Sequence, residues 1–187
     1  MTISLQGLEK EYNQRLPIYK QLEEESVYIL REELNNSELK IHSIPSRIKK
    51  FESICRKTEE KELKYALNEI TDVVGLRIVC LFISEISKIG DIIRKSFDVI
   101  SEDNKIDGFD ASKFGYMSVH FLVKIKDSFT GTRYNSIKNI NFEIQVRTIA
   151  MDAWANISRH LNYHNELAIP KELKRDFYAI SGLFYVA

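Results

Sequence analysis

An apolar run limits what this chain can fold into more than any other feature of its sequence. Residues 73–82 read VVGLRIVCLF, and only Gly75 and Arg77 interrupt the apolar side chains. The run is too short for a typical isolated helix and is rich in β-branched residues, which favour strands. We therefore expect residues 73–82 to form a central, buried strand.

Helices are expected on either side of that strand. Apolar and aromatic residues recur at helical spacing over residues 8–34, with a kink or a join between two helices at Pro17. Residues 35–37 (NNS) then end the helical stretch. After a short extended piece at 41–44, Ser46 is the expected N-cap of a helix that continues through Lys57. Ser84 is the expected cap of a helix that reaches Ile93.

The rest of the chain alternates between strands and connections. Strands are expected at 97–100, 117–125 and 141–147, with a polar loop at 101–115 and a hairpin connection at 126–139. Thr148 should cap a helix whose inward-facing residues are Met151, Trp154, Ile157 and Leu161. A last helix is expected from Pro170. These elements predict an α+β fold with a mixed sheet of about five strands flanked by helices.

Composition narrows the class of protein. Hydrophobic residues make up 44% and charged residues 29% of the chain, as in folded domains that are not membrane-embedded. Lys plus Arg (27) balance Asp plus Glu (27), so no general basicity indicates a nucleic-acid or membrane binder. Cys55 and Cys80 do not suggest a disulfide framework and favour a cytoplasmic location. No apolar run reaches the length of a membrane span, and the polar start is unlike a signal peptide.

Polar residues stand where the sheet should be apolar. Asp72 precedes the apolar strand, Arg77 lies inside it, and Glu143, Gln145 and Arg147 alternate along one face of a later strand. Burying a charge is costly unless the charge is paired or holds a ligand. In one interpretation Arg77 pairs with Glu143, or the polar face is open to water. In the other, Asp72 and Glu143 on neighbouring strands hold Mg²⁺ together with substrate phosphates.

Four segments, taken in order, resemble the RelA/SpoT-type (p)ppGpp synthetase domain, particularly its small single-domain members. SRIKKFESICRK (residues 46–57) resembles the helix on the ATP side, and DVVGLR (72–77) resembles the metal-binding strand. GYMSVH (115–120) resembles the loop that binds the guanine nucleotide, and EIQVRTIAMDAW (143–154) the acidic strand and the helix after it. The resemblance implies one nucleotidyltransferase-like synthetase domain over residues 1–187, with N-terminal helices at 8–34, a catalytic core at 46–164 and a C-terminal helix from 170.

The resemblance also implies roles on the ATP side. Arg47 and Arg77 would enclose the adenine, and Lys49 and Lys57 would neutralise the phosphates. Asp72 and Glu143 would hold Mg²⁺, and these two are the catalytic pair. The 3′-hydroxyl of GDP or GTP would attack the β-phosphorus of ATP, with Glu143 orienting or deprotonating that hydroxyl.

On the acceptor side the resemblance implies a guanine nucleotide site. Its residues would be Lys113, Tyr116, His120, Gln145, Arg147 and Asp152, with Tyr116 stacking on the base. Met117 departs from the family, whose small members commonly carry Arg or another polar residue there, and this leaves the acceptor open. The chain has no His-Asp pair of the family's hydrolase domain, so alarmone hydrolysis is not expected.

Three hypotheses follow for the function. The first is synthesis of ppGpp or pppGpp from ATP and GDP or GTP. In the second the acceptor is the 3′ end of tRNA or an adenosine nucleotide, as in toxic relatives, and a neighbouring antitoxin would be a partner. The third is a catalytically silent nucleotide-binding module. The resemblance also allows a homo-oligomer, since small synthetases often form tetramers.

Overall fold

The described part of the chain forms a mixed sheet with helices on both faces. The computed structural model describes residues 5–64, 66–106 and 117–163. The elements run in the order α1 (Leu5–Asn35), β1 (Ile41–Ser43), β2 (Ser46–Ile48), α2 (Phe51–Glu60), α3 (Ala66–Glu69), β3 (Val74–Cys80), α4 (Ile83–Ser96), β4 (Phe97–Asn104), β5 (Val119–Ile125), α5 (Thr132–Asn135), β6 (Phe142–Thr148) and α6 (Ile149–Tyr163).

The sheet places β3 and β6 side by side at its centre. Its strand order is β1-β3-β6-β5-β4, and β2 also pairs with β3. β3 and β6 are parallel, with Gly75 opposite Glu143 and Arg77 opposite Gln145, and the other pairs are antiparallel. This confirms the predicted α+β class and mixed sheet, with six strands in the described part of the chain instead of about five.

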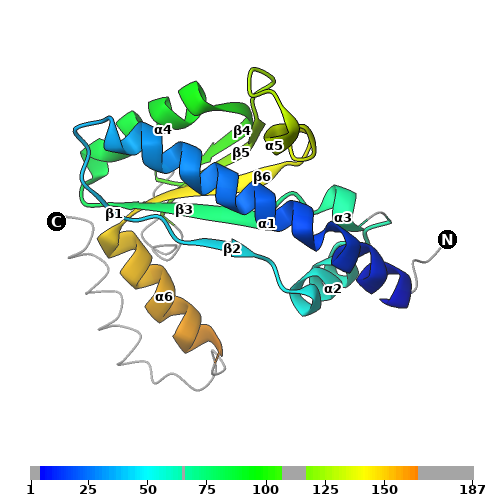
Figure 1. The fold of residues 1–187 in the computed structure, drawn as a ribbon. Coiled ribbons are helices and arrows are strands. Elements are labelled where there is room, and N and C mark those ends of the chain that lie inside the picture. The colour runs from blue at the N-terminus through cyan, green and yellow to red at the C-terminus, as the bar shows by residue number, and fades with distance from the viewer. Residues whose placement is uncertain (1–4, 65, 107–116, 164–187) are drawn as a thin grey trace.

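Alternation along the strands gives the sheet one apolar face and one polar face. On β3, β5 and β6 the side chains of the apolar face are all buried: Val74, Leu76, Ile78, Val119, Phe121, Val123, Ile125, Phe142, Ile144 and Val146. Helices α1 and α4 contact each other and the sheet, and Arg94 of α4 lies over the Phe121 ring. Helix α6 lies on the other side of the sheet from α1 and α4 (Figure 1). The half-buried side chains that alternate with the buried ones, including Arg77, His120 and Glu143, are on that side, where Arg77 pairs with Asp152 of α6.

Pro17 does not divide the N-terminal helix. A single helix, α1, runs from Leu5 to Asn35 with Pro17 inside it, so the predicted join between two helices is wrong. Pro17 removes one backbone hydrogen bond, but it lies on the exposed side of α1. The buried stripe continues on both sides of it, with Leu8 and Tyr12 before and Tyr19 and Leu22 after. Packing of that stripe keeps the helix continuous.

The helix predicted from Ser46 begins later than expected. Residues 46–48 form strand β2, which pairs with Val74–Leu76, and α2 starts at Phe51 after Lys50 in extended conformation. The flanking backbone is also bonded to this edge: Arg77 N–H donates to Pro45 O at 2.8 Å and Lys49 N–H to Val73 O at 2.7 Å. Pairing satisfies polar groups along the edge of β3 and overrides the local capping signal of Ser46.

Several local predictions were correct and others need correction. Thr148 caps α6, because its Oγ1 accepts from Met151 N–H at 3.2 Å, but Ile157 is 45% exposed and does not face inward. Helix α4 starts at Ile83, where Glu85 accepts from the Leu81 and Phe82 N–H groups, so Ser84 is not its cap. β4 continues to Asn104, so the loop predicted from residue 101 begins later.

The helix predicted from Pro170 and the inward position of Leu161 lie outside the residues and side chains that the structure describes.

Within the described residues, no helix combines the length and the apolar character that crossing a membrane requires.

Cys55 and Cys80 are both free thiols. Cys80 is fully buried in β3, and burial raises its pKa to about 11. Cys80 therefore belongs to the core.

Candidate active site

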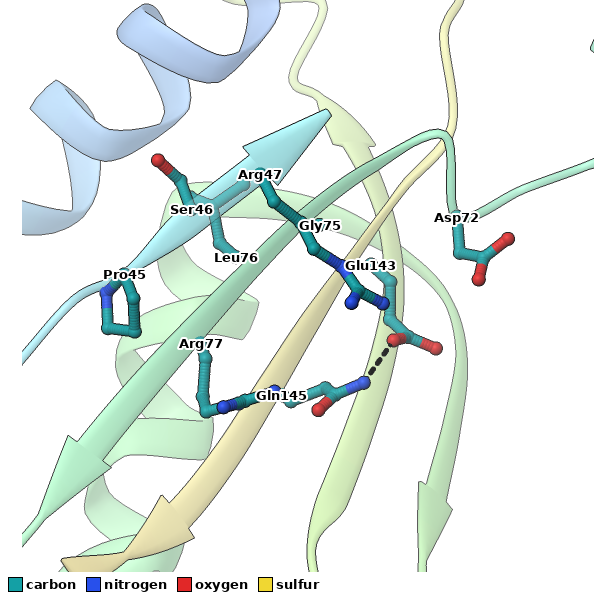
Figure 2. Close-up of a pocket in the computed structure, with 9 residues that line it drawn as sticks. All are labelled: Pro45, Ser46, Arg47, Asp72, Gly75, Leu76, Arg77, Glu143 and Gln145. Atoms are coloured by element: carbon teal, nitrogen blue, oxygen red, sulfur yellow. Dashed lines mark hydrogen bonds between the residues drawn. The ribbon is translucent and has the colours of Figure 1, made fainter. Parts of the chain in front are cut away.

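A cavity opens on the polar face of the sheet where β2, β3 and β6 meet. Its volume is about 180 Å³, and Gly75 and Leu76 form part of its wall (Figure 2). Five of the predicted site residues line it: Arg47, Asp72, Arg77, Glu143 and Gln145. The fold thus brings together residues that are up to about a hundred positions apart in the sequence.

Asp72 enters this cavity from the segment just before β3 and is held by two lysines. Lys49 Nζ lies 2.5 Å from Oδ2, and Lys57 Nζ, on α2, lies 2.8 Å from Oδ1. Burial raises the pKa of Asp72, but the hydrogen bonds and charges of the two lysines outweigh it and hold the pKa below 3.8. Burial lowers the pKa of Lys49 against the attraction of Asp72. Asp72 is therefore ionised at neutral pH with two cations at its oxygens.

Glu143 lies opposite Gly75 on β6 and is held from two sides. His120 Nδ1, on β5, lies 3.2 Å from Oε2, and Gln145 Nε2 donates to Oε1 at 2.5 Å. Burial raises the pKa of Glu143, but the hydrogen bonds from His120 and Gln145 outweigh this effect, so the net shift of the pKa is downward. The charge of Asp72 acts in the opposite direction, as expected for two carboxylates on one cavity. Glu143 is thus an ionised, oriented carboxylate that can accept a proton.

A serine that the sequence analysis did not select supports this carboxylate. Ser118 is fully buried just before β5, and its Oγ lies 2.7 Å from His120 Nε2. Ser118, His120 and Glu143 therefore form one hydrogen-bonded chain. The available signal was a serine two residues before a histidine in an otherwise apolar strand pattern.

Arg77 pairs with α6, so the interpretation in which it pairs with Glu143 is wrong. Its Nη1 lies 2.7 Å from Asp152 Oδ1, with both side chains about one-fifth exposed. Arg147 Nη1 approaches the same oxygen at 4.0 Å, and Arg147 itself is buried. Asp152, predicted at the guanine nucleotide, is engaged by Arg77 and accepts from Asn156 at 3.2 Å. This ion pair connects the first turn of α6 to the centre of the sheet.

Arg47 and Arg77 border a narrow slot over Gly75. Arg47 on β2 pairs directly with Gly75, and a Cβ atom at position 75 would lie 4.0 Å from Arg47 Nε. In Figure 2 the Arg47 side chain extends across β3 toward Glu143, while Arg77 lies toward Gln145. Because Gly75 has no side chain, no Cβ atom narrows the cavity beside Arg47 Nε.

The predicted metal site contains two carboxylates. Asp72 and Glu143 line the same cavity, and in the described ranges no group of three or more His, Cys, Asp or Glu residues could hold a metal ion. Mg²⁺ commonly uses one or two carboxylates plus substrate phosphates and water. The donor set fits that mode of binding. Lys113 and Tyr116, predicted for the guanine nucleotide, lie outside the described residues.

Comparison of the chain with known protein families shows the class to which this fold and cavity belong. The family model described as "Region found in RelA / SpoT proteins" matches residues 46–168. The chain therefore belongs to the RelA/SpoT family.

Two curated relatives and two solved structures make the likeness more specific. The chain is 32% identical over 137 residues to GTP pyrophosphokinase YwaC of Bacillus subtilis (strain 168), covering 71% of this chain and 63% of that protein. It is 31% identical to GTP pyrophosphokinase YjbM of the same organism, covering 72% and 62%. The match therefore spans less than two thirds of either curated relative.

The solved structures match over nearly the whole chain. Small alarmone synthetase 1 of Bacillus subtilis, bound to its product pppGpp, aligns with a TM-score of 0.76 and 28% identity, covering 95% of this chain and 92% of that one. Small alarmone synthetase 2 of the same organism aligns with a TM-score of 0.73 and 27% identity, covering 94% and 93%. Both share the α+β architecture described above.

Proposed function

We propose that this chain transfers pyrophosphate from ATP to the 3′-hydroxyl of GDP or GTP and so makes ppGpp or pppGpp. The observation that carries the proposal is the ionised Glu143, held by His120 and Gln145 on the same cavity as Asp72 and its two lysines. Similarity to GTP pyrophosphokinases and to a synthetase bound to pppGpp supports it. Free cysteines and nucleotide substrates favour a cytoplasmic location.

On the donor side, the adenine of ATP would enter the slot between Arg47 and Arg77. Guanidinium groups stack on flat aromatic rings and remain charged, so they suit a base with phosphates attached. Lys49 and Lys57 would then interact with the phosphates of ATP as well as with Asp72. Their distances of 2.5 and 2.8 Å to Asp72 keep both ammonium groups at the edge of the cavity.

Mg²⁺ would be held by Asp72 and Glu143, and it would neutralise phosphate charge and polarise the phosphorus that is attacked. The acceptor would lie on the side of His120, Gln145, Arg147 and Asp152, with Lys113 and Tyr116 at the guanine. The acceptor 3′-oxygen forms a bond to the β-phosphorus, and the bond from that phosphorus to the α,β-bridging oxygen breaks, releasing AMP. Glu143 accepts the hydroxyl proton. Positioning and charge neutralisation supply most of the rate in such transfers.

Glu143→Gln tests this assignment. The amide keeps the size of the side chain but cannot accept the proton, and a carboxylate base typically contributes about 10²–10⁴-fold. We expect loss of most label transfer from β-³²P-ATP to GDP or GTP, with the urea unfolding midpoint close to that of the wild type. Transfer at the wild-type rate by this variant would remove Glu143 from the mechanism.

The acceptor is decided by parallel reactions of the wild-type protein with GDP, GTP, ADP and deacylated tRNA. Label on the guanosine nucleotides supports the proposal. Label on tRNA or ADP instead would retain the donor chemistry and replace the acceptor. Absence of transfer to all four, with ATP still bound, would identify a nucleotide-binding module.

A further inference from the structure

The two arginines that border the slot over Gly75 are held differently. Arg47 is exposed on β2, whereas the Arg77 side chain on β3 is about one-fifth exposed. Arg77 Nη1 donates to Asp152 Oδ1 at 2.7 Å, and Asp152 lies in the first turn of α6. One side of the slot is therefore fixed to a helix that packs on the sheet, while the other side is not.

Asp152 determines where the Arg77 guanidinium lies. Within residues 5–64, 66–106 and 117–163, it is the only residue with which the Arg77 side chain forms an ion pair or a hydrogen bond. Arg77 Nε is buried without a hydrogen-bond partner in the same ranges, so it adds no second contact. An arginine side chain has many rotamers, and an unheld guanidinium would sample them. The direction of Arg77 thus depends on one contact.

Asp152 contacts the slot only through Arg77. It does not line the active-site cavity, whereas Arg77 does. Both of its oxygens accept hydrogen bonds, Oδ1 from Arg77 and Oδ2 from Asn156 Nδ2 at 3.2 Å, one turn further along α6. A negative side chain is also stabilised in the first turn of a helix. The position of Asp152 is therefore set by its own helix, independently of what the slot contains.

We propose that Asp152 is a positioning residue of the donor site, where it holds the Arg77 guanidinium in the place from which it stacks on the purine of ATP. The inference rests on the proposed function for the identity of the donor. It gives Asp152 a role on the ATP side, in contrast to the contact with guanine that the family resemblance implied. A side chain that is already held in its bound position loses less conformational freedom when the ligand binds, and this strengthens binding.

Two substitutions of equal charge isolate the contact. Asp152→Ala and Asp152→Asn both remove the negative charge, so any change in the repulsion of the ATP phosphates is the same in both. Only Asp152→Asn keeps a side-chain oxygen that can accept from Arg77 Nη1. The positioning role predicts weaker ATP binding in Asp152→Ala than in Asp152→Asn, whereas an effect of charge alone predicts equal binding. Alanine is the best helix former, so Asp152→Ala should leave α6 intact.

Titration calorimetry with Mg²⁺ and a non-hydrolysable ATP analogue measures this difference without turnover. We expect Asp152→Ala to bind the analogue about fivefold more weakly than Asp152→Asn, the cost of ordering one long side chain. Inorganic tripolyphosphate, which has no base, should bind equally to both variants. Asp91→Ala is the matched control, because Asp91 lies 2.7 Å from Arg94 on α4 and neither residue lines the cavity; it should bind the analogue as the wild type does. Equal affinity of Asp152→Ala and Asp152→Asn for the analogue would overturn the proposal.

A double-mutant comparison restricts the effect to Arg77. In an Arg77→Ala background, alanine and asparagine at position 152 should give the same affinity for the analogue, because the contact that distinguishes them is gone. A fivefold difference that persisted in this background would show that Asp152 does not act through Arg77.

Steady-state transfer distinguishes the donor side from the acceptor side. Asp152→Ala should raise the KM for ATP and leave the KM for GDP or GTP near the wild-type value. A rise in the acceptor KM alone would place Asp152 at the guanine nucleotide and overturn the inference while the proposed function stands. A chain that binds the ATP analogue but transfers pyrophosphate to no acceptor would remove the proposed function, and calorimetry would still decide the role of Asp152.

Discussion

Replacing Ser118 with alanine removes one hydroxyl from the hydrogen-bonded chain that ends on Glu143. The Ser118 Oγ lies 2.7 Å from His120 Nε2, and the side chain is fully buried. A carboxylate only accepts hydrogen bonds, so His120 donates to Glu143 through Nδ1, and in the neutral ring Nε2 is then the acceptor. In that ring form the Ser118 hydroxyl donates to Nε2. Ser118 therefore holds the orientation of the ring that donates to Glu143, and is a positioning residue.

The size of the effect follows from one buried hydrogen bond. Such a bond contributes about 1–1.5 kcal/mol, and about 1.4 kcal/mol on a barrier is a tenfold change in rate. We expect kcat/KM of Ser118→Ala to fall about tenfold if the loss reaches the transition state in full. Burial raises the pKa of Glu143, and His120 is the first of the groups that lower it. Loosening His120 therefore raises that pKa, and the acidic limb of the pH profile moves to higher pH.

The assay is pyrophosphate transfer measured as a function of pH, with Ser96→Ala as the matched control. Ser96 is also buried, but its Oγ donates to Ile92 O at 2.7 Å within α4. Ser96→Ala should lower the urea midpoint without moving the acidic limb. If the acidic limb of the pH profile and the kcat/KM of Ser118→Ala both equal those of the wild type, Ser118 does not position His120 and the explanation is refuted.

Three further predictions follow from the same geometry. Gly75→Leu should fill the slot beside Arg47 and raise the KM for ATP about tenfold, the equivalent of about 1.4 kcal/mol of lost stacking, whereas Gly75→Ala, with its Cβ 4.0 Å from Arg47 Nε, should bind ATP normally. Asp72→Asn should lose about 1.5–3 kcal/mol of unfolding free energy at neutral pH, the contribution of hydrogen bonds to a charged group; because the folded pKa of Asp72 is lowered, urea titrations should show this difference above the ordinary pKa of an aspartate and its loss as the pH falls through the lower folded pKa. Pro17→Ala should raise the unfolding free energy by about 1–3 kcal/mol by restoring a helix hydrogen bond at an exposed position, and a lower urea midpoint would contradict this explanation.

Local sequence patterns predicted most elements because each pattern reports a local cause. The apolar run at 73–82 became β3, and the alternation at 141–147 became β6, since a strand with one buried face must alternate. Thr148 capped α6 because a threonine oxygen can satisfy a free N–H in the first turn wherever the helix packs. These signals need no knowledge of distant residues.

The same reasoning failed where a distant segment competed. Ser46 looked like a helix cap, but residues 46–48 pair with the edge of β3 as a strand. Pro17 looked like a join, but packing on both sides kept α1 continuous. In each case tertiary hydrogen bonding or burial outweighed a local preference of a few kcal/mol at most.

Sequence by itself determined which residues bring polar groups into the sheet: Asp72, Arg77, Glu143 and Gln145 stand out because an apolar strand has no local use for them. Tertiary structure alone decided their partners. Arg77 pairs with Asp152 and not with Glu143, and Glu143 is held by His120 and, through it, by Ser118. Strand order and register set these distances, and a chain read from one end to the other contains neither. The two carboxylates therefore became one site only when β3 and β6 came together in parallel.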